Sequence, residues 1–268
     1  MDKSKFRFLI GRFLDTLSFG DHLTSRKYYS IRDCEIDSAA QEATRGGDLV
    51  VLAALSPVLA RSINAQKLVR ELSAEGFRVF VLTRDSKRTF SGAEMTIHWT
   101  HSGRDFFALK CAWINRIEFF RTTEKVLFLN DSIKWSRGAI SNLMKFHNSA
   151  KYVLLPTESF QVRQHAQPYF FMIPANFDNR VIRKILAPAR NWRFKRSAVR
   201  WGEFNFLHNI KESKINYSFL LDHLQFHKVT NTRCNNSKFF GCRQNPTFEA
   251  STYLWKSYGF KKIESTST

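Results

Sequence analysis

The fold class is decided by two stretches, Leu49-Val-Val-Leu-Ala-Ala-Leu55 and Lys125-Val-Leu-Phe-Leu-Asn130-Asp131-Ser132. Each is a short apolar run that ends in polar or turn residues, which is typical of a buried strand. Residues 78–83, 95–99 and 152–155 have the same character. Strands that are apolar on both faces need helices on both faces, so these runs predict a mainly parallel sheet.

Helical spacing of apolar residues lies between the predicted strands. It predicts helices at 60–75, 105–120 and 137–147, and Gly76 stands at the usual C-terminal position of the first. Strands that alternate with helices indicate β-α-β units and an α/β fold. Beyond residue 160 the pattern is less regular, and we predict an extended segment at 169–173 and helices at 179–186, 203–210 and 217–226.

Composition limits the classes of partner. The 42 Lys and Arg residues outnumber the 23 Asp and Glu residues, which gives a net charge of +19 in 268 residues. Such a surface attracts polyanions: nucleic acid, an anionic membrane or a phosphate-bearing ligand. A hydrophobic content of 43% excludes a disordered chain. No apolar run approaches the ~18 residues of a membrane-spanning helix.

The N-terminal residues and the cysteines indicate a cytoplasmic protein. The N-terminus has no signal-peptide pattern, and the four cysteines form no Cys-x-x-Cys pair. With no linker in between, we expect a basic extension at 1–45 and one α/β domain at 46–268. Within the extension, residues 6–18 have the spacing of an amphipathic helix, which either packs on the core or lies on an anionic membrane surface.

The first polar cluster is Asn130-Asp131-Ser132, directly after a predicted buried strand. Ligands of an open α/β sheet bind outside the carboxyl ends of its strands. A carboxylate there, Asp131, is well placed to hold a cation that neutralises a diphosphate. The alternative is that Asn130 and Ser132 only form a turn and cap the next helix.

Two further polar clusters follow other predicted strands. Gly103 allows close approach of the backbone, and Asp105 lies in the first turn of a predicted helix, which also describes an ordinary helix start. Glu158, His165 and Gln167 lie on a stretch with alternating polar residues. His165 has the chemistry of an acid, a base or a hydrogen-bond donor, although a lone histidine is also a common structural residue.

A fourth cluster has the residue types of a zinc site: His223, His227, Cys234 and Cys242. The spacing between the cysteines differs from the Cys-x2–4-Cys knuckle of structural zinc sites. We therefore favour ordinary side chains over a metal centre.

Taken together, the clusters resemble the rhamnan-synthesis protein F family of bacterial cell-surface polysaccharide glycosyltransferases over residues 49–264. The likeness rests on a Gly-x-Asp-Phe segment, an Asn-Asp-Ser strand end, a Thr-Glu segment, a His-x-Gln-x-Tyr-Phe stretch and a C-terminal group. In this chain these are Gly103-Arg104-Asp105-Phe106, Asn130-Asp131-Ser132, Thr157-Glu158, His165-Ala166-Gln167-Pro168-Tyr169-Phe170, and Glu203, Asn245-Pro246-Thr247, Trp255 and Phe260-Lys261-Lys262. The chain departs from the family at Pro168, where the family has Ser, and at Phe107, where Gly is common.

The resemblance implies a Rossmann-like glycosyltransferase A-type fold with a more helical C-terminal part. Asn130-Asp131-Ser132 then occupies the place of the Asp-x-Asp motif that binds Mg²⁺ or Mn²⁺, but only Asp131 is ionised. Metal-independent action stays open, with Lys134, Arg137 or Arg163 neutralising the diphosphate.

The implied activity is hexosyl transfer from a nucleotide-sugar donor, such as a rhamnose or other deoxyhexose donor, to a glycan or lipid-linked acceptor at the inner face of the cytoplasmic membrane. Glu158 and His165 are the predicted catalytic residues, and Asp131 is the predicted metal ligand. The predicted donor-binding residues are Gly103, Asp105, Asn130, Asp131, Ser132 and Gln167. The alternatives are a noncatalytic accessory protein of polysaccharide assembly and a basic nucleic-acid-binding protein. The sequence lacks the motifs of the latter, so we expect no nucleic-acid partner.

Overall fold

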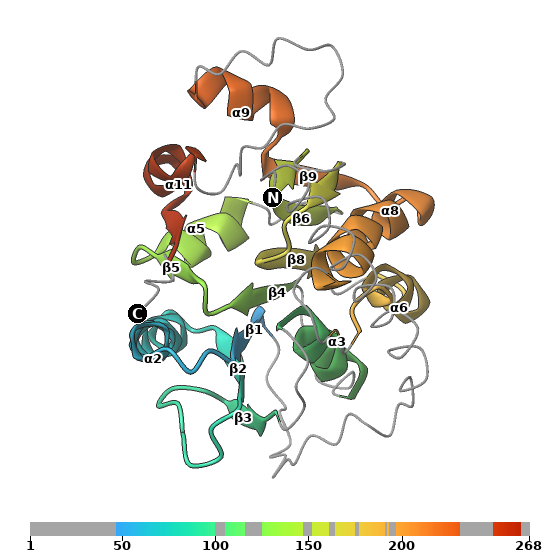
Figure 1. The fold of residues 1–268 in the computed structure, drawn as a ribbon. Coiled ribbons are helices and arrows are strands. Elements are labelled where there is room, and N and C mark those ends of the chain that lie inside the picture. Colours follow the sequence, from blue (N-terminus) through green and yellow to red (C-terminus); the bar gives the residue numbers. More distant parts are fainter. Residues whose placement is uncertain are drawn as a thin grey trace, which may run out of the picture.

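The predicted apolar runs form the strands of one central sheet in the computed structural model (Figure 1). The structure describes residues 47–99, 105–115, 125–146, 152–160, 164–174, 177–190, 192, 197–230 and 249–263. The predicted strands are β1 (Leu49–Ala54), β2 (Arg78–Thr83), β3 (Met95–His98), β4 (Lys125–Asn130) and β6 (Val153–Ser159). All residues of β1 and β2 are buried, as their composition predicts.

The sheet is mixed but mainly parallel. Its strand order is β3-β2-β1-β4-β8-β6-β7, with β9 (Tyr217–Leu221) paired to β6. Strands β3, β2, β1 and β4 are parallel, and β9 is parallel to β6. Strand β8 (Phe170–Pro174) runs antiparallel to both β4 and β6, and the short β7 (His165–Ala166) is antiparallel to β6. The predicted α/β class is confirmed.

Helices cover both faces of the sheet (Figure 1). Helices α2 (Leu59–Ala74), α5 (Ala139–Phe146) and α11 (Ser251–Tyr258) lie on one face. Helices α3 (Asp105–Asn115), α6 (Asn179–Leu186) and α8 (Phe204–Glu212) lie on the other. Each face of the sheet has its own hydrophobic core. Because side chains alternate along a strand, Val50 and Leu52 pack into the core on the α2 face, and Leu49 and Val51 pack into the core on the α3 face.

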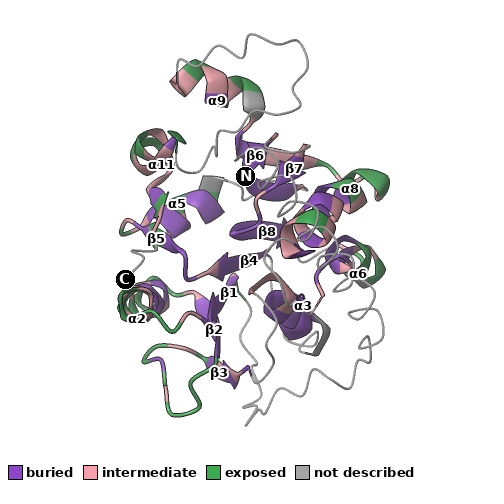
Figure 2. Cartoon of the chain, viewed as in Figure 1, coloured by how far each residue is buried: buried purple, intermediate pink, exposed green. Residues whose placement is uncertain are grey.

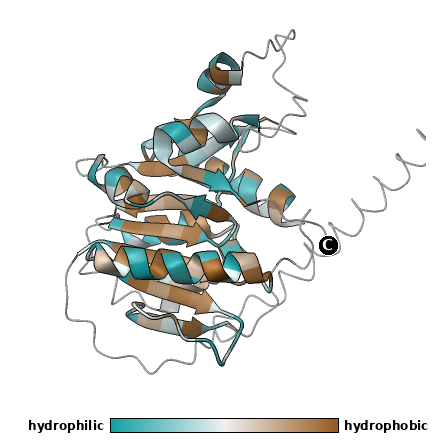
Figure 3. Ribbon diagram, turned by 90° about the vertical axis from the view of Figure 1, so that its left-hand side faces the viewer, coloured by the Kyte–Doolittle hydropathy of each residue, from teal (hydrophilic) through white to brown (hydrophobic). Residues whose placement is uncertain are grey.

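The figures show how the two cores enclose the sheet. Buried residues gather along the strands and on the sheet-facing sides of the helices (Figure 2). In Figure 3, where α2 faces the viewer, much of the sheet is hydrophobic. Helix α2 buries Ala65, Leu68, Val69 and Leu72 against it, which is the i, i+3, i+4, i+7 spacing of an amphipathic helix.

The predicted helix at 217–226 is wrong. Residues Tyr217–Leu221 form β9, and a helix, α9 (His223–Thr230), begins only after it. A short apolar run does not distinguish strand from helix by periodicity, and pairing with β6 decides for the strand. The helix predicted at 203–210 is found as α8, preceded by a π-helical turn at Ala198–Glu203.

A two-stranded antiparallel ribbon joins distant parts of the chain. It pairs β5 (Ile133–Trp135), which follows β4, with β10 (Phe260–Lys262). Gly259 precedes β10 at φ +70°, and a Cβ there would stand 2.7 Å from the Cβ of Ala139. The ribbon therefore requires glycine at this position.

Some expectations concern residues outside the described ones: the amphipathic helix at 6–18, Gly103, Arg163, Cys234 and Cys242. In the described part of the chain, no helix is both long enough and apolar enough to cross a bilayer.

Candidate functional site

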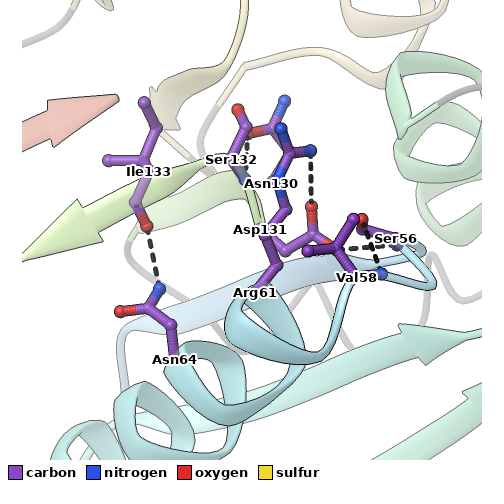
Figure 4. A network of polar contacts seen from close by, with 8 residues as sticks. All are labelled: Ser56, Val58, Arg61, Asn64, Asn130, Asp131, Ser132 and Ile133. Carbon is purple, nitrogen blue, oxygen red and sulfur yellow. Dashed lines mark hydrogen bonds and ion pairs between the residues drawn. The ribbon is translucent and has the colours of Figure 1, made fainter. Parts of the chain in front are cut away.

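The site is built where β1 and β4 end side by side. Parallel pairing sets Ala53 opposite Asn130, so the turns that follow both strands lie at the same edge of the sheet. The Ser56 N–H donates to Asp131 Oδ2 at 2.8 Å, and the Asp131 N–H donates to the Ala53 carbonyl at 3.1 Å. Figure 4 shows this junction. The two loops are thus fixed to each other.

Asn130 shapes the turn after β4. Its side-chain oxygen accepts hydrogen bonds from the Ser132 N–H, at 3.1 Å, and from the Ser132 hydroxyl. These hydrogen bonds form the turn that the sequence predicts as the alternative to a binding role for Asn130 and Ser132. The next element is strand β5 rather than a helix, however, and Asn130 and Ser132 also line a cavity. The turn role and a binding role are therefore compatible.

Asp131 is a buried carboxylate with a fixed cationic neighbour. It is 3% exposed, and its Oδ1 lies 3.8 Å from Nη1 of Arg61 in the first turn of α2 (Figure 4). Burial raises the pKa of Asp131 to about 6 from 3.8, with a further rise from the charge of Asp105. The Ser56 N–H, Arg61 and Arg88 act in the opposite direction. The Ser56 N–H first, and then the two arginines, therefore favour the ionised form of Asp131 against the effect of burial.

A cavity of about 360 Å³ opens beside this turn. Five of the predicted site residues line it, although they come from α3, the β4–β5 turn and the β7 region. They are Asp105, Asn130, Ser132, His165 and Gln167. The structure thus brings together three of the clusters that the sequence separates, as expected from their positions after strands.

The wall formed by the His165–Tyr169 segment is held by hydrogen bonds. The Thr157 hydroxyl donates to Gln167 Oε1 at 2.9 Å, and the Tyr169 hydroxyl donates to Thr157 Oγ1 at 3.3 Å. The Asn130 N–H donates to the Tyr169 carbonyl at 3.0 Å, which connects this wall to the β4 turn. His165 is 2% exposed, with its ring centroid 4.8 Å from that of Phe204.

The two positions that depart from the family pattern also face this space. Pro168 and Phe107 both line the cavity. Phe107 contributes an aromatic ring and Pro168 a rigid pyrrolidine ring to the wall that a ligand would meet.

Glu158 lies outside the residues that line the cavity. Its Oε1 accepts a hydrogen bond from Gln164 Nε2, and Gln164 in turn accepts one from Lys211 at 2.6 Å. Glu203, at the end of the π-helical turn, does line the cavity. The catalytic role of Glu158 stays a prediction, and Glu203 is a second carboxylate to test beside it.

The cavity is also lined by three cations that the sequence motifs do not place there: Arg61, Arg190 and Lys262. They come from α2, from the loop after α6 and from β10. Two cations suggested from the sequence line other hollows: Lys134 faces α2, and Arg137 lies between α5 and α11. Only Lys262 carried a sequence signal, as part of the Phe-x-Lys ending.

A buried lysine holds the loop that carries Arg190. Lys110 on α3 is 3% exposed, and its Nζ donates to the Ala189 carbonyl at 2.9 Å and to the Ala187 carbonyl at 3.4 Å. An ammonium group bound by carbonyl oxygens fixes a loop that has no regular structure of its own.

The described residues offer a poor metal site. Both carboxylate oxygens of Asp131 already face N–H donors, those of Ser56 and Arg61. Within the described residues, no group of three or more His, Cys, Asp or Glu side chains gathers to hold an ion. The sequence leaves action with Mg²⁺ or Mn²⁺ and metal-independent action both open, and nothing above tests either. The zinc site that the sequence disfavours includes two cysteines outside the described residues.

Comparison with known proteins gives likeness of fold only. No protein-family model matches the chain, and no curated protein sequence matches it significantly. The glycosyltransferase GlyE of Streptococcus pneumoniae TIGR4 is 16% identical, with a TM-score of 0.47, over 83% of this chain and 55% of GlyE, so the chain spans about half of that protein. A glycosyltransferase involved in glycosylation of the major capsid of PBCV-1 is 11% identical, with a TM-score of 0.48, over 82% of this chain and 94% of that one. At these scores the likenesses carry no argument about activity, and the resemblance to rhamnan-synthesis protein F proteins stays a prediction.

Proposed function

We propose that this protein transfers a sugar from a nucleoside-diphosphate sugar to an acceptor hydroxyl. The observation that carries the proposal is the cavity at the carboxyl edge of β1 and β4, where three cations meet polar and acid–base side chains. An open α/β sheet presents its ligand site at this edge. The motif resemblance described above points to the same chemistry.

The cavity suits part of a phosphate-bearing ligand. Its volume of about 360 Å³ lies at the lower end of the range typical of small-molecule sites. Guanidinium groups such as those of Arg61 and Arg190 match the geometry of phosphate oxygens. Asp105 and Gln167 are suited to hydroxyl groups of the ribose or the sugar, because carboxylate and amide oxygens accept hydrogen bonds from hydroxyl groups.

The reaction needs one bond formed and one broken at the anomeric carbon. The acceptor oxygen attacks that carbon while the bond to the diphosphate breaks, and the nucleoside diphosphate leaves with the electron pair. The acceptor proton passes to a base. Three side chains are candidates for this base. His165 and Glu203 line the cavity, and Glu158 lies outside its lining. The cations stabilise the charge that develops on the leaving group.

The donor and acceptor follow from the family resemblance alone. It points to a rhamnose or other deoxyhexose donor, and to a glycan or lipid-linked acceptor. A lipid-linked acceptor would place the enzyme at an anionic membrane surface, which the charge of +19 favours.

The first test is calorimetric titration with UDP-, GDP-, dTDP- and CMP-sugars, followed by measurement of nucleoside diphosphate release. We expect one donor class to bind, and Asp131→Ala to weaken that binding. If no donor binds while RNA or a polysaccharide binds tightly, the nucleic-acid or accessory alternative replaces the enzyme.

A matched pair of variants assigns the base. Glu203→Gln and Glu158→Gln each remove one carboxylate, the first inside the cavity lining and the second outside it. General-base catalysis contributes about 10²–10⁴-fold in rate, so the variant that loses this factor in kcat, with donor binding unchanged, identifies the base. Full turnover in both would leave His165 as the candidate.

A further inference from the structure

We infer that protein cations, and not a divalent metal ion, neutralise the donor diphosphate, and that Arg61 takes the place beside Asp131 where a metal ion would otherwise sit. The inference rests on the proposed function and specifies how its site works. Asp131 then acts as a positioning residue, since its carboxylate holds Arg61 at the edge of the cavity.

The engagement of Asp131 argues against its use as a metal ligand. Its Oδ2 accepts the Ser56 N–H at 2.8 Å, and its Oδ1 is paired with Arg61 Nη1 at 3.8 Å. Mg²⁺ demands near-octahedral oxygen ligands at about 2.0–2.1 Å. An ion on either oxygen would have to displace an N–H group or a cation from a carboxylate that is 3% exposed. Neither neighbouring motif residue, Asn130 or Ser132, adds a second carboxylate.

Arg61 itself is held ready to bind an anion. It lies in the first turn of α2, directly after the β1 loop, and it lines the cavity. Its Nε is buried and has no hydrogen-bond partner within the described part of the chain. A buried donor left without a partner costs about 1–3 kcal/mol, so a shift of the Arg61 side chain toward a ligand oxygen in the cavity would be favoured.

The other two cations are also positioned by the fold. The pairing of β10 with β5 fixes the backbone position of Lys262, and the Nζ of Lys262 lies 5.9 Å from the ring centroid of Tyr169. Arg190 lies on the loop that Lys110 holds, with its Cζ 5.9 Å from the ring centroid of Trp192. Positive charges from three separate elements therefore line one cavity in fixed positions. Such preorganised charges stabilise the negative charge that develops on a departing diphosphate.

The test is calorimetric titration of the full chain with UDP, GDP and dTDP, the leaving groups of the candidate donors, in EDTA and in excess Mn²⁺. We expect one of them to bind with nearly the same affinity in both conditions. Arg61→Ala should weaken that binding about 10- to 100-fold in EDTA, because a charge-assisted contact is lost. Arg70→Ala, which removes an exposed arginine from the same helix, should not change it.

Arg61→Ala also leaves Asp131 without its ion-pair partner, so a second variant guards against misfolding. Arg61→Ala combined with Asp131→Asn removes the pair together and should show the same loss of affinity. Binding that requires Mn²⁺, or that survives both variants, overturns the inference while the proposed function stands. Binding of no nucleoside diphosphate in either condition overturns both.

Discussion

Replacing Asp131 by Asn should stabilise the protein at neutral pH. Burial raises the pKa of Asp131 to about 6 in the folded chain, from 3.8 for an ordinary aspartate. The folded state therefore holds this proton more tightly than the unfolded state does. Stability from this group is present below 3.8 and is lost as the pH rises toward 6. Ionised Asp131 thus costs the folded protein about 3 kcal/mol at neutral pH.

The assay is urea unfolding of the wild type and Asp131→Asn at about pH 4.5 and about pH 7.5. Asn keeps an oxygen that can accept the Ser56 N–H but loses the ion pair with Arg61, and position 131 titrates only in the wild type. The free-energy difference between the two proteins should grow by about 2 kcal/mol in favour of the variant between those pH values. Groups that titrate in both proteins contribute equally to the two free energies of unfolding, so their contributions cancel in the difference between wild type and variant. A difference that stays constant with pH would show that the Asp131 carboxyl is not held in the environment described here.

Three other outcomes follow from the structure. Gly259→Ala should lower the free energy of unfolding in urea by about 2–5 kcal/mol, because the new Cβ overlaps neighbouring atoms and the backbone is left-handed. The control Gly138→Ala, at φ +74° in open space, should lower it by about 1 kcal/mol. Equal losses would exclude the steric overlap at Gly259. Lys110→Met should leave buried carbonyls without their donor, lower stability by about 1–3 kcal/mol and weaken nucleotide binding, and unchanged binding would separate this lysine from the site. Leu59 and Ile63, 72% and 60% exposed and four residues apart on α2, should contribute to vesicle binding, so their joint replacement by Ser should lower affinity for anionic liposomes about tenfold; unchanged sedimentation would place the membrane contact elsewhere.

The sheet could be predicted from the sequence where the signal is local. The strands β1, β2 and β4 are apolar on both faces, and that pattern alone indicates burial on both sides. Strand β9 could not be predicted because a run of five residues is too short for its periodicity to distinguish strand from helix, and only its pairing with β6 decides. The three-residue strands β5 and β10 are too short to carry a signal of their own.

The residues of the candidate site also divide into those that the sequence marks and those that only the fold brings together. Asn130, Ser132 and Asp105 could be found because they stand at a strand end and a helix start, positions that the sequence marks. Arg61 and Arg190 could not, because nothing local distinguishes them from other basic residues. Glu158 is predicted as the base because an attacking hydroxyl needs a nearby carboxylate, but the sequence does not show which face of the strand carries it, since neighbouring side chains of a strand point to opposite faces. Thr157 contacts the cavity wall through Gln167, whereas Glu158 contacts Gln164.

The β5–β10 ribbon also bears on the order of folding. It joins the turn after β4 to a segment far along the chain, and the Ile263 N–H donates to the Ser132 carbonyl at 2.7 Å. Contacts between residues distant in sequence form late, because the entropy of closing a long loop is lost before they stabilise the chain. Lys262 should therefore reach the cavity after the central strands have paired. During refolding, the circular-dichroism signal of the sheet should return before the capacity to bind a nucleotide.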